Sequence, residues 1–246
     1  MKYDGMTIFS ERDEFGLVEV VENRVTRKLH FDSPIEQSCV YINAPMTLNF
    51  EYQEKIIERV VDFANTKFSP SQKNRRPLRA LMLGMGGGTM ATHLFHTLPN
   101  LQMTVVELRQ TVIDCAYRFF QLPNVPEIEA VQSDAIEFIA EDDSLYDVIM
   151  IDLFDAEGLP SALSDTEFQN NLWKSLSSPG LLIFNLWYRW EINPTGGRPV
   201  PNEESEIVLD FWQAFQDTAS NENAKCTLNR YNAQSSQNLI LELLKR

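Results

Sequence analysis

The sequence predicts an α/β protein in which a doubly wound, mostly parallel sheet follows a small antiparallel β unit. From residue 80 onward, short apolar runs alternate with stretches of helical period, which is typical of a parallel sheet covered by helices on both faces. Residues 6–50 contain successive apolar runs with no helical stretch between them, which indicates antiparallel hairpins. We therefore expect two parts, an N-terminal β unit over residues 1–50 and an α/β domain over residues 51–246.

The composition narrows the classes of partner. Asp and Glu number 35 against 21 Lys and Arg, so the formal net charge is −14. Such a surface repels nucleic acid and attracts cations, including polyamines. The three cysteines and three histidines show no metal-ligand spacing, no stretch approaches the roughly 18 apolar residues of a membrane span, and the N-terminus lacks a basic-then-apolar leader. We expect a reduced, cytoplasmic protein that binds no metal, no nucleic acid and no membrane.

The elements of the first part are predicted from the spacing of apolar residues, which follows the period of a strand and then that of a helix. Apolar runs predict strands at Gly16–Glu22, Arg24–Phe31 and Cys39–Ile42. The alternation of apolar and polar residues is clearest at Arg24–Phe31. An apolar stripe at helical spacing then predicts a helix over Tyr52–Ala64, and a polar linker over residues 65–79 leads into the second part.

The second part is predicted to alternate strands with helices. We expect strands at Ala80–Leu83, Thr104–Glu107, Ile128–Gln132, Tyr146–Ile151, Leu181–Asn185 and Leu239–Leu243. We expect helices at Thr89–Leu98, Thr111–Phe119, Ala135–Ala140, Asp165–Leu176 and Ser205–Ser220. Residues 178–180 are expected to turn the chain into the strand at Leu181, and residues 188–202 form a loop that could cover a site.

A glycine-rich turn follows the first strand of this domain. Its sequence is Gly84-Met85-Gly86-Gly87-Gly88, and a helix is expected from Thr89 onward. A buried strand, a glycine turn and a helix in this order present backbone N–H groups to a ligand, and glycines allow its close approach. Glu107 ends the next strand, 19 residues after Gly88, where a carboxylate can accept hydrogen bonds from both hydroxyls of an adenosine ribose. The pair predicts a nucleoside site.

Acidic side chains follow the next two strands. Asp134 comes directly before the helix predicted from Ala135, where it can cap that helix and also reach an adenine amino group; the two roles are compatible. Asp152 and Asp155 follow the mostly hydrophobic five-residue strand Asp147–Ile151, and we expect both to be functional, whereas Glu157 is expected to face solvent. Ligands of open α/β sheets bind at the carboxyl ends of the strands, so these acids should meet the glycine turn.

The fifth strand ends in an amide and aromatic side chains. Asn185 lies near the same mouth, and Trp187 suits a core position as well as a stacking one.

A pair of carboxylates indicates a cationic substrate. No lysine follows the glycines as in a nucleotide-triphosphate loop, and no Gly-x-Ser-x-Gly nucleophile motif is present. If the donor carries a sulfonium, attack by a neutral amine moves positive charge from sulfur to nitrogen. A carboxylate beside the amine then stabilises the transition state more than the ground state, and it can accept the released proton.

Several segments together resemble the spermidine synthase family, the aminopropyltransferases built on the Rossmann-like fold of class I S-adenosylmethionine-dependent methyltransferases. The similarity runs from roughly the first β-hairpin to the strand at Leu181. It is carried by Leu29-His30-Phe31-Asp32, Ile35-Glu36-Gln37, Tyr52-Gln53-Glu54, the glycine turn, Glu107, Ser133-Asp134-Ala135 and Asp152-x-x-Asp155-x-x-Gly158-x-Pro160.

The resemblance implies a role for each matched residue. Asp152 would accept the proton and, with Asp155 and Tyr52, form the amine site. The donor, S-adenosylmethionine or its decarboxylated form, would be held by Gln53, Gly84, Gly86, Gly87, Gly88, Glu107, Asp134, Ala135 and Asp152. It further implies a small amine or polyamine as acceptor, and together with the N-terminal β unit it suggests a homodimer.

Three departures from the family pattern concern the substrate side. Gly87 stands where the family has an Asp that helps to hold the donor's terminal amine, and Leu153-Phe154 replaces a Ser-Ser pair. The family's Pro-Thr-Tyr-Pro-Ser-Gly segment has no counterpart between Tyr188 and Arg246. The cofactor half of the resemblance therefore holds better than the substrate half.

Three functions remain open at this point. The first is an aminopropyltransferase-like enzyme, the second a methyltransferase that uses intact S-adenosylmethionine, and the third a non-catalytic nucleoside-binding or assembly module. Gly87 favours the second, because the carboxylate of intact S-adenosylmethionine would no longer face a negative charge. A dinucleotide-dependent oxidoreductase fits the glycine spacing and the acidic loop poorly.

Overall fold

The computed structural model describes residues 2–67, 76–154, 163, 165–187, 213–221, 225–233, 235 and 238–246, with the side chain of Trp187 left out. Several predictions fall outside these residues. They concern Asp155 with the rest of its loop through Pro160, the loop at residues 188–202 and the first half of the helix expected at Ser205–Ser220. Residues 213–221, which follow, are helical.

Four antiparallel strands form the N-terminal sheet, as predicted, in the order β1-β2-β3-β4. They span Met6–Asp13 (β1), Gly16–Glu22 (β2), Thr26–Phe31 (β3) and Glu36–Tyr41 (β4). The sequence pattern predicted only three of these strands. β1 was missed because it is an edge strand with side chains exposed on both faces, so its sequence shows no apolar alternation.

The second sheet has seven strands in the order β10-β11-β9-β8-β5-β6-β7. The middle of the sheet is parallel, whereas β11 pairs antiparallel with both β9 and β10. The strands span Leu78–Leu83 (β5), Leu101–Glu107 (β6), Ile128–Gln132 (β7), Tyr146–Ile151 (β8), Leu176–Trp187 (β9), Cys226–Ala233 (β10) and Asn238–Lys245 (β11). The prediction of a mostly parallel, doubly wound sheet is therefore confirmed.

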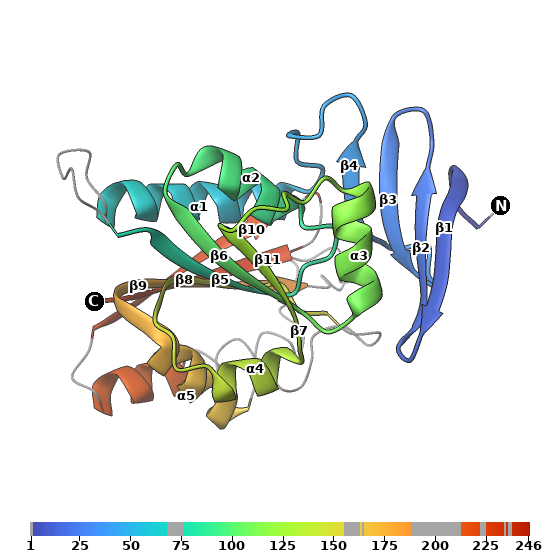
Figure 1. Cartoon of the computed structure of the whole chain (residues 1–246). Coiled ribbons are helices and arrows are strands. Elements are labelled where there is room, and N and C mark those ends of the chain that lie inside the picture. Colours follow the sequence, from blue (N-terminus) through green and yellow to red (C-terminus); the bar gives the residue numbers. More distant parts are fainter. Residues whose placement is uncertain are drawn as a thin grey trace, which may run out of the picture.

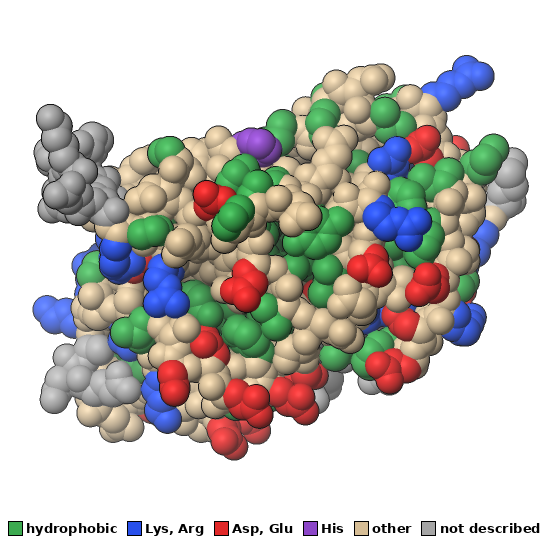
Figure 2. Space-filling view, viewed as in Figure 1, with side chains coloured by type: hydrophobic (Ala, Val, Ile, Leu, Met, Phe, Trp, Pro, Cys, Tyr) green, Lys and Arg blue, Asp and Glu red, His purple; other side chains and the backbone are tan. Residues whose placement is uncertain are grey.

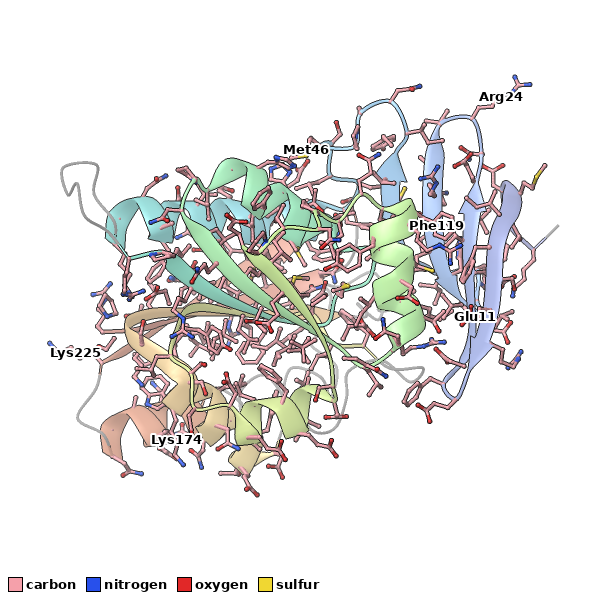
Figure 3. All side chains as sticks on the ribbon, viewed as in Figure 1. Glu11, Arg24, Met46, Phe119, Lys174 and Lys225 are labelled. Atoms are coloured by element: carbon pink, nitrogen blue, oxygen red, sulfur yellow. The ribbon has the colours of Figure 1, made fainter. Side chains whose placement is uncertain are left out.

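Helices cover both faces of this sheet (Figure 1). On one face lie α1 (Glu51–Lys67) and α2 (Thr89–Thr97), and on the other lie α4 (Ala135–Glu141), α5 (Thr166–Ser175) and the helix at 213–221. α3 (Gln110–Phe119) lies between the two sheets, where Phe119 at its end reaches Phe9 of β1 with ring centroids 5.4 Å apart (Figure 3).

Strand β5 shows why the sequence is continuously apolar at the centre of the sheet. Ala80 and Met82 belong to the core under α1 and α2, whereas Leu81 and Leu83 belong to the core under α4 and α5. Successive side chains of a strand point to opposite faces, and here both faces are covered. All four side chains are almost fully buried.

Three local predictions need correction. Residues 178–180 do not separate a helix from a strand, because β9 already begins at Leu176; Leu176 pairs with Tyr146 and Leu181 with Val148, so the residues between form a bulge. β10 was not predicted, because it is an edge strand of mostly half-buried and exposed side chains. Helix α1 extends to Lys67, beyond the predicted end.

The surface is strongly acidic on one side. Figure 2 shows acidic side chains along the edge where Figure 1 places α4 and α5. Exposed members of this group are Glu129, Glu137, Glu141, Asp143, Asp165 and Glu167. Among the helices that the structure describes, none has the length and apolar character needed to cross a membrane.

Candidate active site

The strand order has a switch point at β5, and we call the space outside the carboxyl ends of the neighbouring strands the crevice. β5 has β6 on one side and β8 on the other, so the chain reverses its direction of progress across the sheet at β5. In open α/β sheets, ligands bind at this switch point, outside the carboxyl ends of the strands. Those ends carry the glycine turn after β5, Glu107 on β6, Asp134 after β7 and Asp152 after β8.

Gly84 brings the ends of β5 and β8 together. It adopts φ +89°, and a Cβ there would overlap the carbonyl oxygen of Asp152. Its N–H donates to Val106 O on β6 at 2.9 Å, while the N–H of Asp152 donates to Leu83 O at 2.9 Å. Only glycine tolerates both the left-handed φ and this close backbone approach. Asp152 therefore lies directly beside the glycine turn, as the sequence predicted.

Gly87 lies where a side chain has no room. A Cβ on it would come within 2.6 Å of Ser38 Oγ and 2.9 Å of the Phe120 ring. Gly86 faces the backbone of Gln37 on β4, and Gly88 precedes the first turn of α2. The N-terminal sheet thus closes one side of the glycine turn.

Glu107 holds the backbone of the turn. Its Oε2 accepts from the N–H of Met85 at 3.1 Å, and its Oε1 accepts from the N–H of Arg109 at 3.1 Å. Burial raises the pKa of this carboxyl, whereas the backbone N–H groups of Arg109, Met85 and Gly86 oppose that shift. The side chain is half-buried, so part of it remains accessible from outside the protein.

A buried ion pair joins this edge of the sheet to the N-terminal unit. Arg109 donates through Nε and Nη2 to the two carboxylate oxygens of Asp13 at 2.9 and 2.8 Å, and through Nη2 to Gly16 O at 3.1 Å. Its guanidinium also lies over the Phe31 ring at 4.6 Å. No spacing or period in the sequence indicates this pair, because its members are 96 residues apart.

Asp134 caps helix α4 and remains at the crevice. Its Oδ1 accepts from the N–H of Ile136 at 2.7 Å and of Glu137 at 3.4 Å. Both bonds use the same oxygen, and the side chain is half-buried. Ala135 is the first residue of the helix. The predicted cap is confirmed, and the contact with adenine stays a prediction.

Gln53 carries an unpaired acceptor. Its Nε2 donates to Thr89 Oγ1 at 3.1 Å, which ties α1 to the start of α2. Its Oε1 is buried and has no hydrogen-bond partner within the described structure. Buried polar atoms are seldom left unpaired in proteins, so this oxygen suits the N–H or O–H of a ligand. The residues present therefore fit a nucleoside that carries a polar tail.

A second cluster surrounds Asp152. Asn185 Nδ2 donates to its Oδ1 at 2.7 Å, and the Tyr52 hydroxyl donates to its Oδ2 at a longer 3.5 Å. Burial raises the pKa of Asp152 to about 6, while the hydrogen bonds from Asn185 and Tyr52 oppose that shift. Burial together with the charge of Asp152 also raises the pKa of Tyr52 well above its usual value. An acid with this pKa is largely ionised at neutral pH and still basic enough to accept a proton.

The apolar pair after Asp152 is partly exposed. Leu153 is half-buried, and Phe154 is 37% exposed. Asp155 lies outside the described residues, so its place in the cluster stays a prediction.

Sequence reasoning missed one member of the cluster. Asn238 Nδ2 donates to Asn185 Oδ1 at 2.8 Å and is almost fully buried. It comes from β11, one residue before the predicted strand at Leu239–Leu243. Since β11 runs antiparallel to β9, its first residue lies at the carboxyl end of the neighbouring strand. A polar residue opening the last predicted strand was the available signal.

Comparison with known proteins identifies the family. The spermine/spermidine synthase domain matches residues 50–188, which include Tyr52, the glycine turn, Glu107, Asp134 and Asp152. The chain belongs to this family. Among the residues that the structure describes, no cluster of three or more His, Cys, Asp or Glu side chains could hold a metal ion.

Curated relatives agree with this assignment. The polyamine aminopropyltransferase of Chromobacterium violaceum is 28% identical over 171 residues, which cover 69% of this chain and 61% of that protein. The chain therefore spans less than two thirds of the length of this relative.

Solved structures are similar in fold. A probable spermidine synthase from Corynebacterium glutamicum matches with a TM-score of 0.68 and 19% identity, over 97% of this chain and 79% of the other. Human methyltransferase-like protein 13, solved in complex with SAH, matches with a TM-score of 0.61 and 19% identity, over 78% of this chain and 81% of the other.

Proposed function

We propose that this chain is a transferase that moves an aminopropyl group from decarboxylated S-adenosylmethionine, as co-substrate, to a small amine of the polyamine class. Membership of the spermine/spermidine synthase family supports the reaction class. The observation that carries the proposal is the contact between Gly84 and Asp152, because it brings a nucleoside-type turn and a carboxylate of raised pKa to one place.

The donor would lie across the carboxyl ends of β5, β6 and β7. Glu107 would accept hydrogen bonds from the ribose hydroxyls with the accessible part of its side chain. Asp134 would reach the adenine amino group, and the backbone around Gly86 would lie under the sugar. The unpaired Oε1 of Gln53 would accept a hydrogen bond from the tail of the donor.

Asp152 would act on the acceptor amine. The lone pair of the amine nitrogen forms a bond to the carbon attached to sulfur, and the carbon–sulfur electron pair stays on sulfur, which becomes neutral. The nitrogen then carries the positive charge and an extra proton. Asp152 Oδ2, which faces Tyr52, stabilises that charge and accepts the proton.

A second candidate is methyl transfer from intact S-adenosylmethionine. The surroundings of Gly87 favour it, because Ser38 and Phe120 leave no room for a side chain at this position. Position 87 therefore offers no acid that could pair with the ammonium of a decarboxylated donor. The same Asp152 would then serve an amine or another acceptor. The similarity in fold to a methyltransferase shows only that this scaffold is shared.

Thermal melting with three ligands separates these functions. A larger rise in melting temperature with decarboxylated S-adenosylmethionine than with the intact form supports aminopropyl transfer, and the reverse order supports methyl transfer. Methylthioadenosine tests the nucleoside site alone. Equal melting temperatures with and without all three ligands would contradict both enzymes and the nucleoside-binding module, and would leave only an assembly module, since ligands that bind the folded state raise its stability.

The assembly and location are also proposals. We infer a homodimer in which the N-terminal sheet takes part, because the edge strand β1 exposes Met6 and Ile8. A cytoplasmic location is supported by three free cysteines, two of them buried. We further propose a domain boundary near residue 50, directly before α1. Sedimentation of the purified chain tests the dimer.

A further inference from the structure

Two asparagines stand behind Asp152 in a single line of hydrogen bonds. Asn238 Nδ2 donates to Asn185 Oδ1 at 2.8 Å, and Asn185 Nδ2 donates to Asp152 Oδ1 at 2.7 Å. The three side chains come from β11, β9 and the end of β8, which are neighbours in the sheet.

Both amides are removed from solvent. Asn185 is 1% exposed and Asn238 is 7% exposed. Burying an amide is unfavourable unless its hydrogen bonds are made. Two apolar side chains at these positions would not carry this free-energy cost. A structural role alone would be served equally well by two apolar side chains between β9 and β11.

The order of the bonds gives the line a direction. An asparagine amide has one end that donates and one end that accepts. Because Asn238 occupies the accepting end of Asn185 with an N–H, only the donating end of Asn185 is left for Asp152. A donor favours the ionised form of a carboxylate, whereas an acceptor would favour the protonated form.

The hairpin that carries Asn238 is fixed to the helix that carries Tyr52. Ser235, in the turn between β10 and β11, donates through its N–H and its hydroxyl to Glu51 Oε2, both at 2.9 Å. Glu51 is the first residue of α1, next to Tyr52. The position of Asn238 relative to Asp152 and Tyr52 is therefore set from two elements.

We propose that Asn185 and Asn238 are positioning residues that hold Asp152 in its ionised form with Oδ1 occupied, so that Oδ2 alone meets Tyr52 and the acceptor amine. This inference deepens the proposed function and rests on it for its effect on turnover. The asparagines set the lowest pH at which the transfer proceeds.

The groups around Asp152 are few in the described structure. Tyr52 is the titratable side chain that contacts it from α1, and Asn185 is the neutral one from β9. β5 faces it with Gly84, which has no side chain. Glu107, on β6, is engaged by the backbone of Met85 and Arg109. Asn238 is joined to Asp152 by hydrogen bonds through Asn185.

The test uses two substitutions at one position. Asn238→Asp keeps the shape and, when ionised, offers only acceptors, so Asn185 must turn its N–H to position 238 and its oxygen to Asp152. The added charge raises the pKa of Asp152 further. Asn238→Leu removes the donor without adding charge. Asn232→Leu is the matched control, because Asn232 lies exposed on the same hairpin.

The first measurement is the pKa of Asp152 from carboxyl ¹³C NMR, with the signal assigned by its loss in Asp152→Asn. We expect a rise of about half a unit in Asn238→Leu and of more than about one unit in Asn238→Asp, with no change in Asn232→Leu. An unchanged pKa in both position-238 variants would overturn the proposal. If the leucine variant does not fold, the smaller Asn238→Ala, which also removes the donor without adding charge, decides.

The second measurement is the pH–rate profile. In the position-238 variants the acidic limb should move to higher pH by the same amount as the pKa of Asp152. The kcat at high pH should equal that of the wild type. Loss of kcat at all pH values without a shift of the limb indicates a structural role and overturns the proposal. The NMR measurement needs no turnover. A protein without transferase activity would therefore refute the proposed function, and the pKa values would still decide whether the two asparagines act on Asp152.

Discussion

The two halves of the crevice are built in different ways. The nucleoside half consists of backbone and end-of-strand residues, the glycine turn after β5, Glu107 and Asp134, whose positions follow from the parallel sheet. The amine half brings together Tyr52 from α1, Asp152 after β8, Asn185 from β9 and Asn238 from β11. One half depends on local geometry, and the other depends on side chains from four elements.

This difference indicates which half of the crevice tolerates substitutions. Glycine conformations and the pairing of β5 with β6 and β8 leave little freedom at the nucleoside half. The amine half can change one side chain at a time without disturbing the sheet. Two of the three departures from the family pattern, at Leu153-Phe154 and after Tyr188, fall on that side, whereas Gly87 lies in the glycine turn itself. Substitutions should therefore separate binding of the donor from turnover.

The largest expected effect is loss of turnover in Asp152→Asn. Asparagine keeps the shape but cannot accept the proton, so the rate of transfer should fall by about 10²- to 10⁴-fold. The increase in melting temperature caused by methylthioadenosine should stay, because the nucleoside half is intact. A variant that keeps its transfer rate would remove Asp152 as the proton acceptor.

The reciprocal effect is expected for Glu107→Gln. The amide cannot accept from both Met85 and Arg109, and it loses the charge that would bind the ribose hydroxyls. The dissociation constant for methylthioadenosine, measured by calorimetry, should rise roughly 10- to 100-fold. Glu129→Gln, on the exposed side of β7, is the control. Equal affinities of the two variants for methylthioadenosine would show that Glu107 does not bind the nucleoside.

A third expected effect concerns the dependence of folding stability on pH. Asp152 has a pKa of about 6 in the folded protein against 3.8 in its ordinary state, so the folded state binds the proton more tightly. Its contribution to stability is therefore greatest below about pH 4 and is lost as the pH rises through 6, by about 2–3 kcal/mol. Asp152→Asn avoids this loss. Urea unfolding at pH 4 and pH 8 should show the variant gaining on the wild type only at the higher pH; a constant difference would contradict a raised pKa.

The sequence predicted what is local. The strands β7 and β8 begin and end where the apolar runs do, and Asp134 caps α4 as its position before Ala135 indicated. Gly84 and Asp152 were expected to meet because strand ends of a parallel sheet share one edge. Tyr52 was placed by the resemblance to the family, since its apolar stripe indicated only a helix.

The rest depends on distant partners. Arg109 and Asp13 form a pair across 96 residues, and Asn238 reaches Asn185 across 53. No period or spacing in one sequence shows such pairs. The edge strands β1 and β10 were missed for another reason, because one side of an edge strand lacks a neighbour and much of it stays exposed.

The most direct test is a crystal structure with bound S-adenosylmethionine or its decarboxylated form. The account predicts the adenosyl group over the glycine turn, the ribose hydroxyls on Glu107 and the sulfur within about 6 Å of Asp152 Oδ2, with room between them for one amine. A nucleoside bound elsewhere, or a sulfur more than about 12 Å from Asp152, would contradict a shared site.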